Sequence, residues 1–185
     1  MTAPLIALTG VPVLTTERLV LRAPEALDFD AFADYAASER SRFTGGPQAR
    51  DLAWRGFCGV AGHWAIRGYA FFVMEHRETG RAVGMAGPWF PEGWPEPEIG
   101  WQLWDPGFEG QGLAHEAALE TRRFAYDTLG WSTAISLIAP ENARSAALAR
   151  RIGCRYDRAF THERYGACDI WRHPAPGKSA SGVAA

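Results

Sequence analysis

The sequence contains few cysteines, only three in 185 residues, and they lie far apart at Cys58, Cys154 and Cys168. The number is odd, no Cys-x-x-Cys pair occurs, and no cysteine–histidine spacing matches a metal site. We therefore expect neither a disulfide framework nor a bound metal. The three cysteines are predicted to be reduced, mostly buried thiols in a reducing compartment.

An excess of basic charge is also absent. Lys plus Arg total 19 against 21 acidic residues, the net charge is −2, and no run of Lys or Arg occurs. Because affinity for nucleic acid comes mainly from cationic contacts with phosphates, nucleic acid is not an expected partner. An anionic ligand would have to be held by a local device such as a helix N-terminus.

The chain has no apolar run that could span a membrane, so a membrane is not an expected partner either. Residues 1–15 carry no basic segment and are interrupted by Pro4 and Pro12, which is unlike a signal peptide. We predict a cytoplasmic protein. The sequence does not determine the oligomeric state, and it leaves a homodimer open.

Hydrophobic residues make up 47% of the chain, which is enough for one well-packed core. We predict a single domain over residues 1–173 and a flexible tail over residues 174–185, which are rich in Pro, Gly, Ser and Ala. Asp28 and Asn142 are expected to cap helices. The predicted helices span residues 28–40, 51–66, 113–129 and 142–153, and the predicted strands span 17–22, 69–75, 82–87, 98–104, 133–139, 155–160 and 167–172. This order indicates an α/β or α+β domain with a mixed sheet.

The most informative stretch is residues 105–117, where a strand ends, a turn with Gly110 and Gly112 follows, and a helix begins at once. The first backbone N–H groups of a helix have no internal partner and lie at the positive end of its dipole. Glycines remove side chains that would obstruct a phosphate, so the turn can seat a pyrophosphate. The alternative is a plain glycine turn. A dinucleotide fingerprint is excluded because the third glycine position is His115, and no Walker lysine is present.

A second cue follows the next strand, at Asn142 and Ser145. The ordinary interpretation is that Asn142 caps a helix and Ser145 is a first-turn residue. The functional interpretation is that both side chains face a cleft beside the pyrophosphate turn. Two successive strand–helix units place both helix N-termini at the same edge of a sheet, where ligands bind.

Three stretches resemble the GCN5-related N-acetyltransferase (GNAT) superfamily, in its branch of ribosomal-protein alanine N-acetyltransferases (RimJ/RimL type). They are residues 16–22 (TERLVLR), 109–117 (EGQGLAHEA) and 142–153. The resemblance implies an acetyltransferase that moves an acetyl group from acetyl-coenzyme A to a primary amine by direct attack in a ternary complex. It also implies a mostly antiparallel sheet of about six or seven strands flanked by about four helices.

The resemblance further assigns residues to the cofactor. The pyrophosphate would bind to backbone amides of Gly110, Gln111, Gly112, Leu113 and Ala114. The pantetheine arm would bind to the strand end at Leu103 and Trp104, in a cleft opened by the parting of the fourth and fifth strands, and Asn142 would touch the cofactor as well. Two positions depart from the family: Glu109 is often Gln or Arg there, and His115 replaces a small hydroxyl residue.

Acetyl transfer to an amine needs a general base, and we predict Glu98 for this role, with Glu96 in reserve. Burial beside tryptophans would raise the pKa of Glu98 toward a useful value, although a solvent-facing strand glutamate is the equal alternative. An amide near Leu103 would stabilise the oxyanion. Residues 146–152 contain no tyrosine to protonate the leaving thiolate, so Ser145 is the candidate donor.

Several aromatic residues precede the cofactor motif, where the family binds its acceptor. Trp89 and Trp94 are candidates for the acceptor pocket, together with the loop 43–47. Trp54 and Trp64 are expected to fill the core instead, and His63 is expected to be structural. The acceptor could be a protein N-terminus or a small-molecule amine. The alternative to an enzyme is a non-catalytic acyl-coenzyme A sensor of the same fold.

Overall fold

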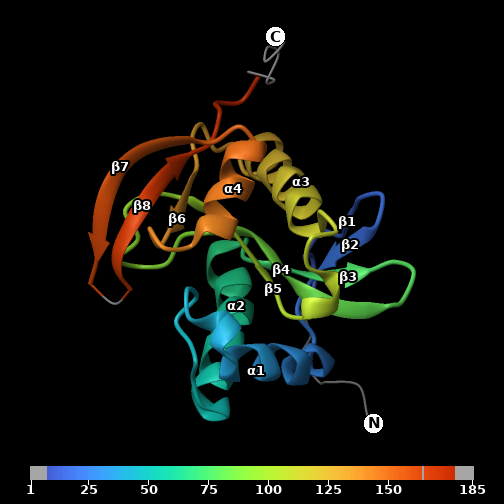
Figure 1. The fold of residues 1–185 in the computed structure, drawn as a ribbon. Helices are drawn as coiled ribbons and strands as arrows, with labels where there is room; N and C mark the ends of the chain where they lie inside the picture. The colour runs from blue at the N-terminus through green and yellow to red at the C-terminus, as the bar shows by residue number, and fades with distance from the viewer. Residues whose placement is uncertain (1–7, 164, 178–185) are drawn as a thin grey trace.

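One mixed sheet and four α-helices make up the computed structural model, which describes residues 8–163 and 165–177. Figure 1 shows their arrangement. The strands are β1 (Leu14–Thr15), β2 (Leu19–Arg22), β3 (Phe72–His76), β4 (Arg81–Trp89), β5 (Glu98–Leu103), β6 (Ile135–Ile138), β7 (Arg155–His162) and β8 (Gly166–Arg172). The helices are α1 (Phe29–Ala37), α2 (Arg50–Arg67), α3 (Leu113–Asp127) and α4 (Ala143–Arg151).

The strand order in the sheet is β1-β2-β3-β4-β5-β6-β8-β7. Every neighbouring pair is antiparallel except β5 and β6, which are parallel because the chain crosses over through α3 between them. That parallel pairing consists of a single residue pair, Glu98 opposite Ile135, and the two strands then separate. The sheet therefore opens beside β5, at its centre.

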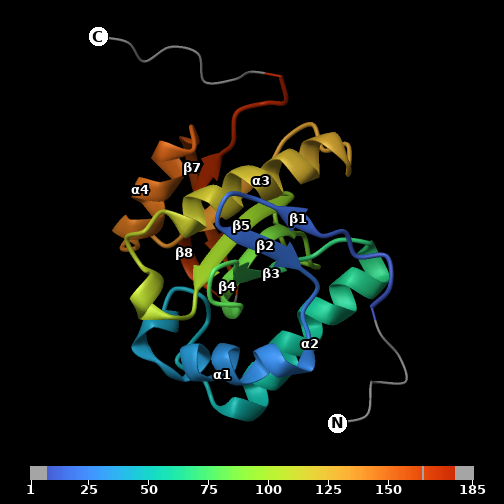
Figure 2. The ribbon, with the colours of Figure 1, turned by 90° about the vertical axis from the view of Figure 1, so that its right-hand side faces the viewer.

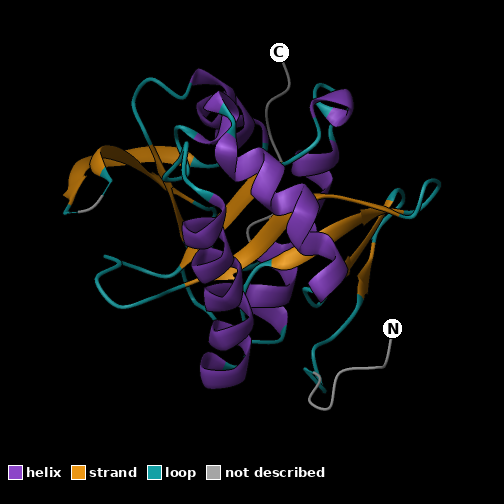
Figure 3. Ribbon diagram, turned by 90° about the horizontal axis from the view of Figure 1, so that it is seen from below, coloured by secondary structure: helices purple, strands orange, loops and turns teal. Residues whose placement is uncertain are grey.

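The helices cover both faces of the sheet. α3 lies on one face, whereas α1 and α2 lie together on the other, as Figure 2 shows. The hairpin of β7 and β8 projects to one side of the molecule (Figures 1 and 3). The two helical layers explain the apolar pattern of the sheet, since residues such as Phe72, Met74 and Met85 are fully buried.

The sequence predicts the fold class correctly, and the eighth strand is the short β1, which pairs Leu14 with Leu21. Asp28 lies at the N-cap position of α1, as predicted, but its carboxylate makes no capping hydrogen bond and instead accepts from the Arg22 guanidinium and the Glu25 N–H. The first helix also ends at Ala37 rather than Arg40, because the backbone turns to an extended conformation at Ser38. Of the predicted tail, residues 178–185 lie outside the described part of the chain.

Helix α2 has the bounds expected from its pattern, but its glycines are costly. Gly56, Gly59 and Gly62 lie inside the helix, where a glycine reduces stability by about 0.5–1 kcal/mol relative to alanine. A Cβ atom added at any of the three would meet no atom within 4 Å outside the local helix backbone. Close packing therefore does not require these glycines.

Candidate active site

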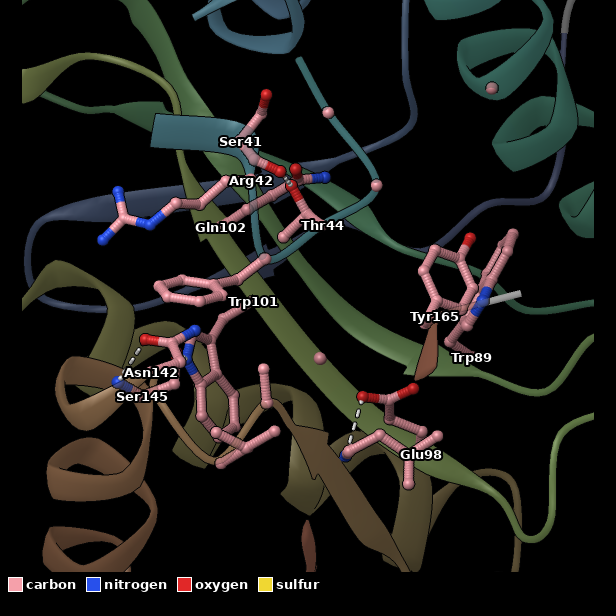
Figure 4. A pocket seen from close by; sticks show the side chains of 18 of the residues that line it. Ser41, Arg42, Thr44, Trp89, Glu98, Trp101, Gln102, Asn142, Ser145 and Tyr165 are labelled. Atoms are coloured by element: carbon pink, nitrogen blue, oxygen red, sulfur yellow. Dashed lines mark hydrogen bonds between the residues drawn. The ribbon is translucent and has the colours of Figure 1, made fainter. Parts of the chain in front are cut away.

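A cavity of about 980 Å³ lies where β5 and β6 part, and Figure 4 shows it from close by. Its walls come from α1 and the loop after it, one face of α2, strands β4, β5, β6 and β8, the loop before β5, the β7–β8 turn and the start of α4. The residues that carry its chemistry are Tyr35, Ser41, Arg42, Thr44, Arg55, Trp89, Trp94, Glu98, Trp101, Ser136, Asn142, Ser145, Tyr165 and Cys168. Segments far apart in the sequence thus meet at the open centre of the sheet.

Glu98 is buried at the point where the two strands separate, with 7% of its surface exposed. One carboxylate oxygen accepts the Leu137 N–H at 3.2 Å, and the other accepts the indole N–H of Trp94. Burial raises the pKa of Glu98 to about 7, and the two hydrogen bonds offset only part of that increase. The alternative of a solvent-facing glutamate is therefore wrong, and a group that titrates near neutral pH lines the cavity.

The reserve candidate, Glu96, lies in a different environment. Its carboxylate forms ion pairs with Arg172 at 2.8 Å and Arg158 at 2.9 Å, and it is not part of the cavity wall. The hydrogen bonds from Arg172 and Arg158 outweigh the effect of burial and lower the pKa of Glu96 to about 2. A carboxylate held in this way is a weak base, and it stabilises the loop before β5 instead.

Beyond Glu98, every second residue of β5 turns its backbone N–H and C=O groups toward the gap between β5 and β6. The Trp104 N–H donates to Val83 of β4, so strand alternation turns the N–H and C=O groups of Trp101 and Leu103 toward β6. Because β6 pairs only at Glu98, no described strand takes up those groups. They form an exposed strand edge, to which an extended amide-bearing arm could hydrogen-bond.

Arg40 reaches the end of this edge, which the sequence did not indicate. Its guanidinium donates to the carbonyl of Leu103 at 3.0 Å and also to that of Trp104. Neither Leu103 nor Trp104 belongs to the cavity wall, and the Trp104 side chain is buried in the core beside Phe32. The β5 residues in the cavity wall nearest this end are Trp101 and Gln102, and of these two only Trp101 turns its backbone groups toward the gap. The assignment of Leu103 and Trp104 to the pantetheine arm stays a prediction.

The turn before α3 has the features expected of an anion site. Gly110 and Gly112 have φ angles of +75° and +83°, which favour glycine, and a Cβ at Gly110 would meet nothing within 4 Å. α3 begins at Leu113 without a side-chain cap. None of the five amides of residues 110–114 donates a hydrogen bond to another group in the described part of the chain. These amides can therefore bind an external anion.

Glu109, one of the departures from the family pattern, is neutralised by two arginines. It forms ion pairs with Arg40 at 2.6 Å and with Arg144 at 2.5 Å. Burial would raise the pKa of Glu109, but the hydrogen bonds and charges of both arginines outweigh it and lower that pKa. The cluster of Glu109 and its two partners carries a net positive charge beside the glycine turn. His115, the other departure, lies in a separate shallow groove with Arg18 and Glu116.

Asn142 has the ordinary role and faces the cavity as well. Its side-chain oxygen accepts the Ser145 N–H at 3.2 Å, which caps α4. The amide nitrogen points away from that bond toward the cavity (Figure 4). The Ser145 hydroxyl accepts the indole N–H of Trp101 at 3.3 Å, so its own hydrogen remains available for donation.

The predicted acceptor residues divide into two groups. Trp89 and Trp94 line the cavity, whereas Trp64 is buried in the core, each as expected. The assignment of Trp54 to the core is wrong, because 48% of its surface is exposed, although its ring packs edge-on against Phe29. His63, as expected, is a buried structural residue, stacked on Trp89 and outside the cavity wall.

The loop 43–47 and the β7–β8 turn approach each other at one end of the cavity. The loop 43–47 lines the wall as predicted, and a Cβ at Gly45 would lie 3.2 Å from the ring of Tyr165. Tyr165 comes from the turn between β7 and β8, and its ring packs against that of Trp94 with the centroids 5.6 Å apart. No sequence motif marks Tyr165, because it reaches the site only through the folding of the β7–β8 hairpin.

Residues 8–163 and 165–177 contain no group of three or more His, Cys, Asp or Glu side chains that could hold a metal ion. Within the same residues, none of the helices has both the length and the apolar character needed to cross a bilayer. Cys154 and Cys168 are buried and Cys58 is exposed, all three as free thiols.

Comparison with known proteins places this geometry among known folds. Residues 18–155 match the family model described as an acetyltransferase (GNAT) domain. An acetyltransferase from Agrobacterium tumefaciens is 35% identical, with 94% of this chain and 99% of that chain covered and a TM-score of 0.82. A GNAT-family acetyltransferase from Bordetella pertussis is 27% identical, with 88% and 99% covered and a TM-score of 0.74.

A more distant match shares the fold alone. The RimL ribosomal L7/L12 α-N-protein acetyltransferase in complex with coenzyme A is 15% identical. The match covers 90% of this chain and 100% of that chain, with a TM-score of 0.72. The fold predicted from the three sequence stretches is thereby confirmed.

Proposed function

Because the chain belongs to the GNAT acetyltransferase family, and is thus an acetyl-CoA-dependent acyltransferase, we propose that its acceptor is a primary amine. The amine belongs either to a protein N-terminus or to a small molecule. It would enter from the end of the cavity lined by Trp89, Trp94 and Tyr165. The observation that carries the proposal is Glu98, a buried carboxylate in the cavity wall whose pKa of about 7 suits removal of a proton from an amine.

The residues present fit coenzyme A. The unpaired amides of residues 110–114 would hold its pyrophosphate, and the free strand edge at Trp101 would hold its pantetheine amides. The side-chain amide of Asn142 faces the same gap (Figure 4). When bound, acetyl-CoA supplies an acetyl thioester, which is already activated for attack by an amine. The protein therefore has to position the amine and remove its proton.

We assign the base to Glu98 and not to Glu96. Glu98 is part of the cavity wall, and its carboxylate can take a proton directly or through one water molecule. Glu96 lies outside that wall and is neutralised by two arginines. Ser145, whose hydroxyl hydrogen is not used by the Trp101 contact, would donate to the leaving thiolate.

Direct attack by the amine is favoured over an acyl-enzyme. The thiol in the cavity wall is Cys168, and burial raises its pKa, as does the negative charge of Glu98. A thiol with a raised pKa is a poor nucleophile. Ser145 is hydrogen-bonded to an indole N–H, which cannot act as a base toward it.

The first prediction tests this function directly. We expect the purified protein to release free thiol from acetyl-CoA only when a primary amine is present, with one acetyl group appearing on that amine. Peptides with free N-termini and a set of small amines should be compared, with thiol release followed by absorbance and products by mass spectrometry. N-terminally blocked peptides serve as controls. Thiol release without an acetylated product, or none with any amine, would contradict the proposal.

The second prediction concerns the width of the acceptor pocket. Gly56 and Gly59 of α2 line the cavity, and a methyl group at either position would project into it without meeting the protein. We expect Gly59→Ala to stabilise the helix by about 0.5–1 kcal/mol. It should also reduce kcat/KM for bulky amines about tenfold, because pocket contacts of one methyl group are of that size.

Gly62→Ala is the matched control for this experiment. Gly62 lies on the same helix and its Cβ position is equally open, but it is not part of the cavity wall. Both variants should therefore show a higher melting temperature, and Gly59→Ala alone should discriminate against large acceptors. The measured quantity is the ratio of kcat/KM for phenylalaninamide to kcat/KM for glycinamide. The same ratio in the wild type, Gly59→Ala and Gly62→Ala would rule out this face of α2 as an acceptor wall.

A further inference from the structure

The hydrogen-bond ladder between β5 and β6 ends where side chains take the place of its next backbone donor and acceptor. The parallel ladder starts with the Ile135 N–H, which donates to the Pro97 carbonyl at 2.9 Å. In a regular parallel ladder the next donor from β6 would be the Leu137 N–H, and its acceptor would be the Ile99 carbonyl. In this protein that hydrogen bond is replaced by two others.

Each half of the missing hydrogen bond has a side-chain partner. The Leu137 N–H donates to the Glu98 carboxylate at 3.2 Å. The Ile99 carbonyl accepts the hydroxyl of Ser136 at 2.6 Å. Both groups are therefore satisfied although the strands are no longer paired, and the sheet can open without leaving buried polar groups unpaired.

His173 fixes the direction of the Ser136 hydroxyl. Its Nε2 lies 3.0 Å from the hydroxyl oxygen, and both side chains are almost fully buried. Because the single hydrogen of Ser136 is donated to the Ile99 carbonyl, Nε2 of His173 must carry a proton and act as the donor. Burial lowers the pKa of His173 to about 3, so the ring is neutral and keeps this tautomer at neutral pH.

We propose that Ser136, oriented by His173, is a positioning residue for Glu98. By donating to the Ile99 carbonyl, the Ser136 hydroxyl competes with the Leu137 N–H for that acceptor and favours the hydrogen bond of Leu137 to the Glu98 carboxylate. The same contact determines where β5 and β6 separate. Its effect on catalysis rests on the proposed function of Glu98, whereas its effect on the carboxylate itself does not.

Other groups near Glu98 have to be considered in any titration. From β8, Cys168 interacts electrostatically with the Glu98 carboxylate. From the loop before β5, Trp94 donates to it and packs against His162 of β7 and against Tyr165. The other charged residues of the described cavity wall are Arg42, Arg55 and Glu141. A substitution at Ser136 replaces none of these groups. A shift in the titration of Glu98 therefore reports the change in hydrogen bonding where β5 and β6 separate.

The test is a carboxylate titration of protein labelled with ¹³C-glutamate, with the Glu98 signal assigned from Glu98→Gln. In Ser136→Ala the Ile99 carbonyl is free to take the Leu137 N–H. Glu98 then loses a hydrogen bond that stabilises its charged form, and the midpoint should rise by roughly one pH unit. Ser136→Thr keeps the hydroxyl and should restore the wild-type midpoint. Thr121→Val removes a buried hydroxyl within α3 and should leave the midpoint unchanged.

A second measurement needs no variant. In the wild type, the amide signal of Leu137 should titrate together with the Glu98 carboxylate, since the two groups share a hydrogen bond. The inference would be overturned if the titration midpoint of Glu98 is unchanged in Ser136→Ala. It would also be overturned if the Leu137 amide signal does not shift when Glu98 ionises. If the carboxylate midpoint moves while the pH profile of acetyl transfer does not, the inference stands and the proposed role of Glu98 fails.

Discussion

Glu98→Gln lowers kcat/KM for amine acetylation by about 10²–10⁴-fold, which is the usual contribution of a general base. Glutamine keeps the size of the side chain and can still accept the Leu137 N–H, but it cannot take a proton. In the wild type, kcat/KM should rise with pH as Glu98 loses its proton, with a midpoint at about 7. With an acceptor amine whose own pKa lies well above that midpoint, the step should be missing in the variant, and only the rise from ionisation of the amine should remain. Initial rates of thiol release, measured from roughly pH 5.5 to 9 so that the expected midpoint is bracketed, give both the loss of kcat/KM and its pH dependence.

Glu96→Gln is the matched control, because it makes the same chemical change two residues earlier. It removes the negative charge from the ion pairs with Arg158 and Arg172, so the protein should lose stability, but the midpoint near 7 should persist. Binding of coenzyme A, measured as the rise in melting temperature with added ligand, should be the same in both variants and the wild type. If Glu98→Gln retains the wild-type pH profile, another group removes the proton.

The sequence predicts most of the fold because its signals are local. Apolar periodicity defines α3, where Leu113, Ala117, Thr121 and Phe124 are buried on one side as expected. Asn142 caps α4 because a cap depends only on its neighbours. Asp28 lies at the N-cap position of α1 but makes no capping hydrogen bond, because an ion pair with Arg22, from the adjacent strand β2, competes for its carboxylate. A pattern within one segment does not reveal such a competitor.

The candidate site was predictable where a single segment makes it. The glycine turn at residues 110–114 presents its own amides, so the sequence alone indicates an anion site. Glu98 was identified from its place on the strand before that turn. The partners of these groups come from elsewhere: Arg40 reaches the strand end from the other face of the sheet, and Ser136 reaches Ile99 from β6. Only the folded chain brings them together.

Glu109 illustrates the same limit for electrostatics. A carboxylate next to an expected phosphate site is unfavourable when it is considered alone. Arg40, which precedes it by 69 residues, and Arg144, which follows it by 35, convert it into the centre of a cationic cluster. The unfavourable charge at one position is thus compensated by residues whose proximity no local pattern indicates.

The second large effect is on stability, where Glu98→Gln should stabilise the protein increasingly as the pH rises. The pKa of Glu98 is about 7 in the folded protein against an ordinary value of 4.5. As the pH rises from 4.5 to 7, the unfolded chain loses this proton while the folded protein retains it, so folding becomes less favourable. One pKa unit corresponds to about 1.4 kcal/mol, which gives the wild type a loss of about 3 kcal/mol by pH 8. Glutamine does not ionise, so the variant escapes this loss.

The difference in unfolding free energy between variant and wild type isolates this one group, because all other titrations are shared. Glutamine places an N–H₂ group opposite the Trp94 indole N–H, which costs about 1 kcal/mol at every pH. The variant should therefore be slightly less stable than the wild type at pH 5 and more stable at pH 8. Urea unfolding at several pH values between these two measures the difference. Glu96→Gln should be less stable than the wild type by a nearly constant amount over this range, because the lowered pKa of Glu96 keeps its carboxylate ionised throughout. A difference that stays constant across that range would mean that Glu98 ionises at its ordinary pKa and is not held in a desolvated site.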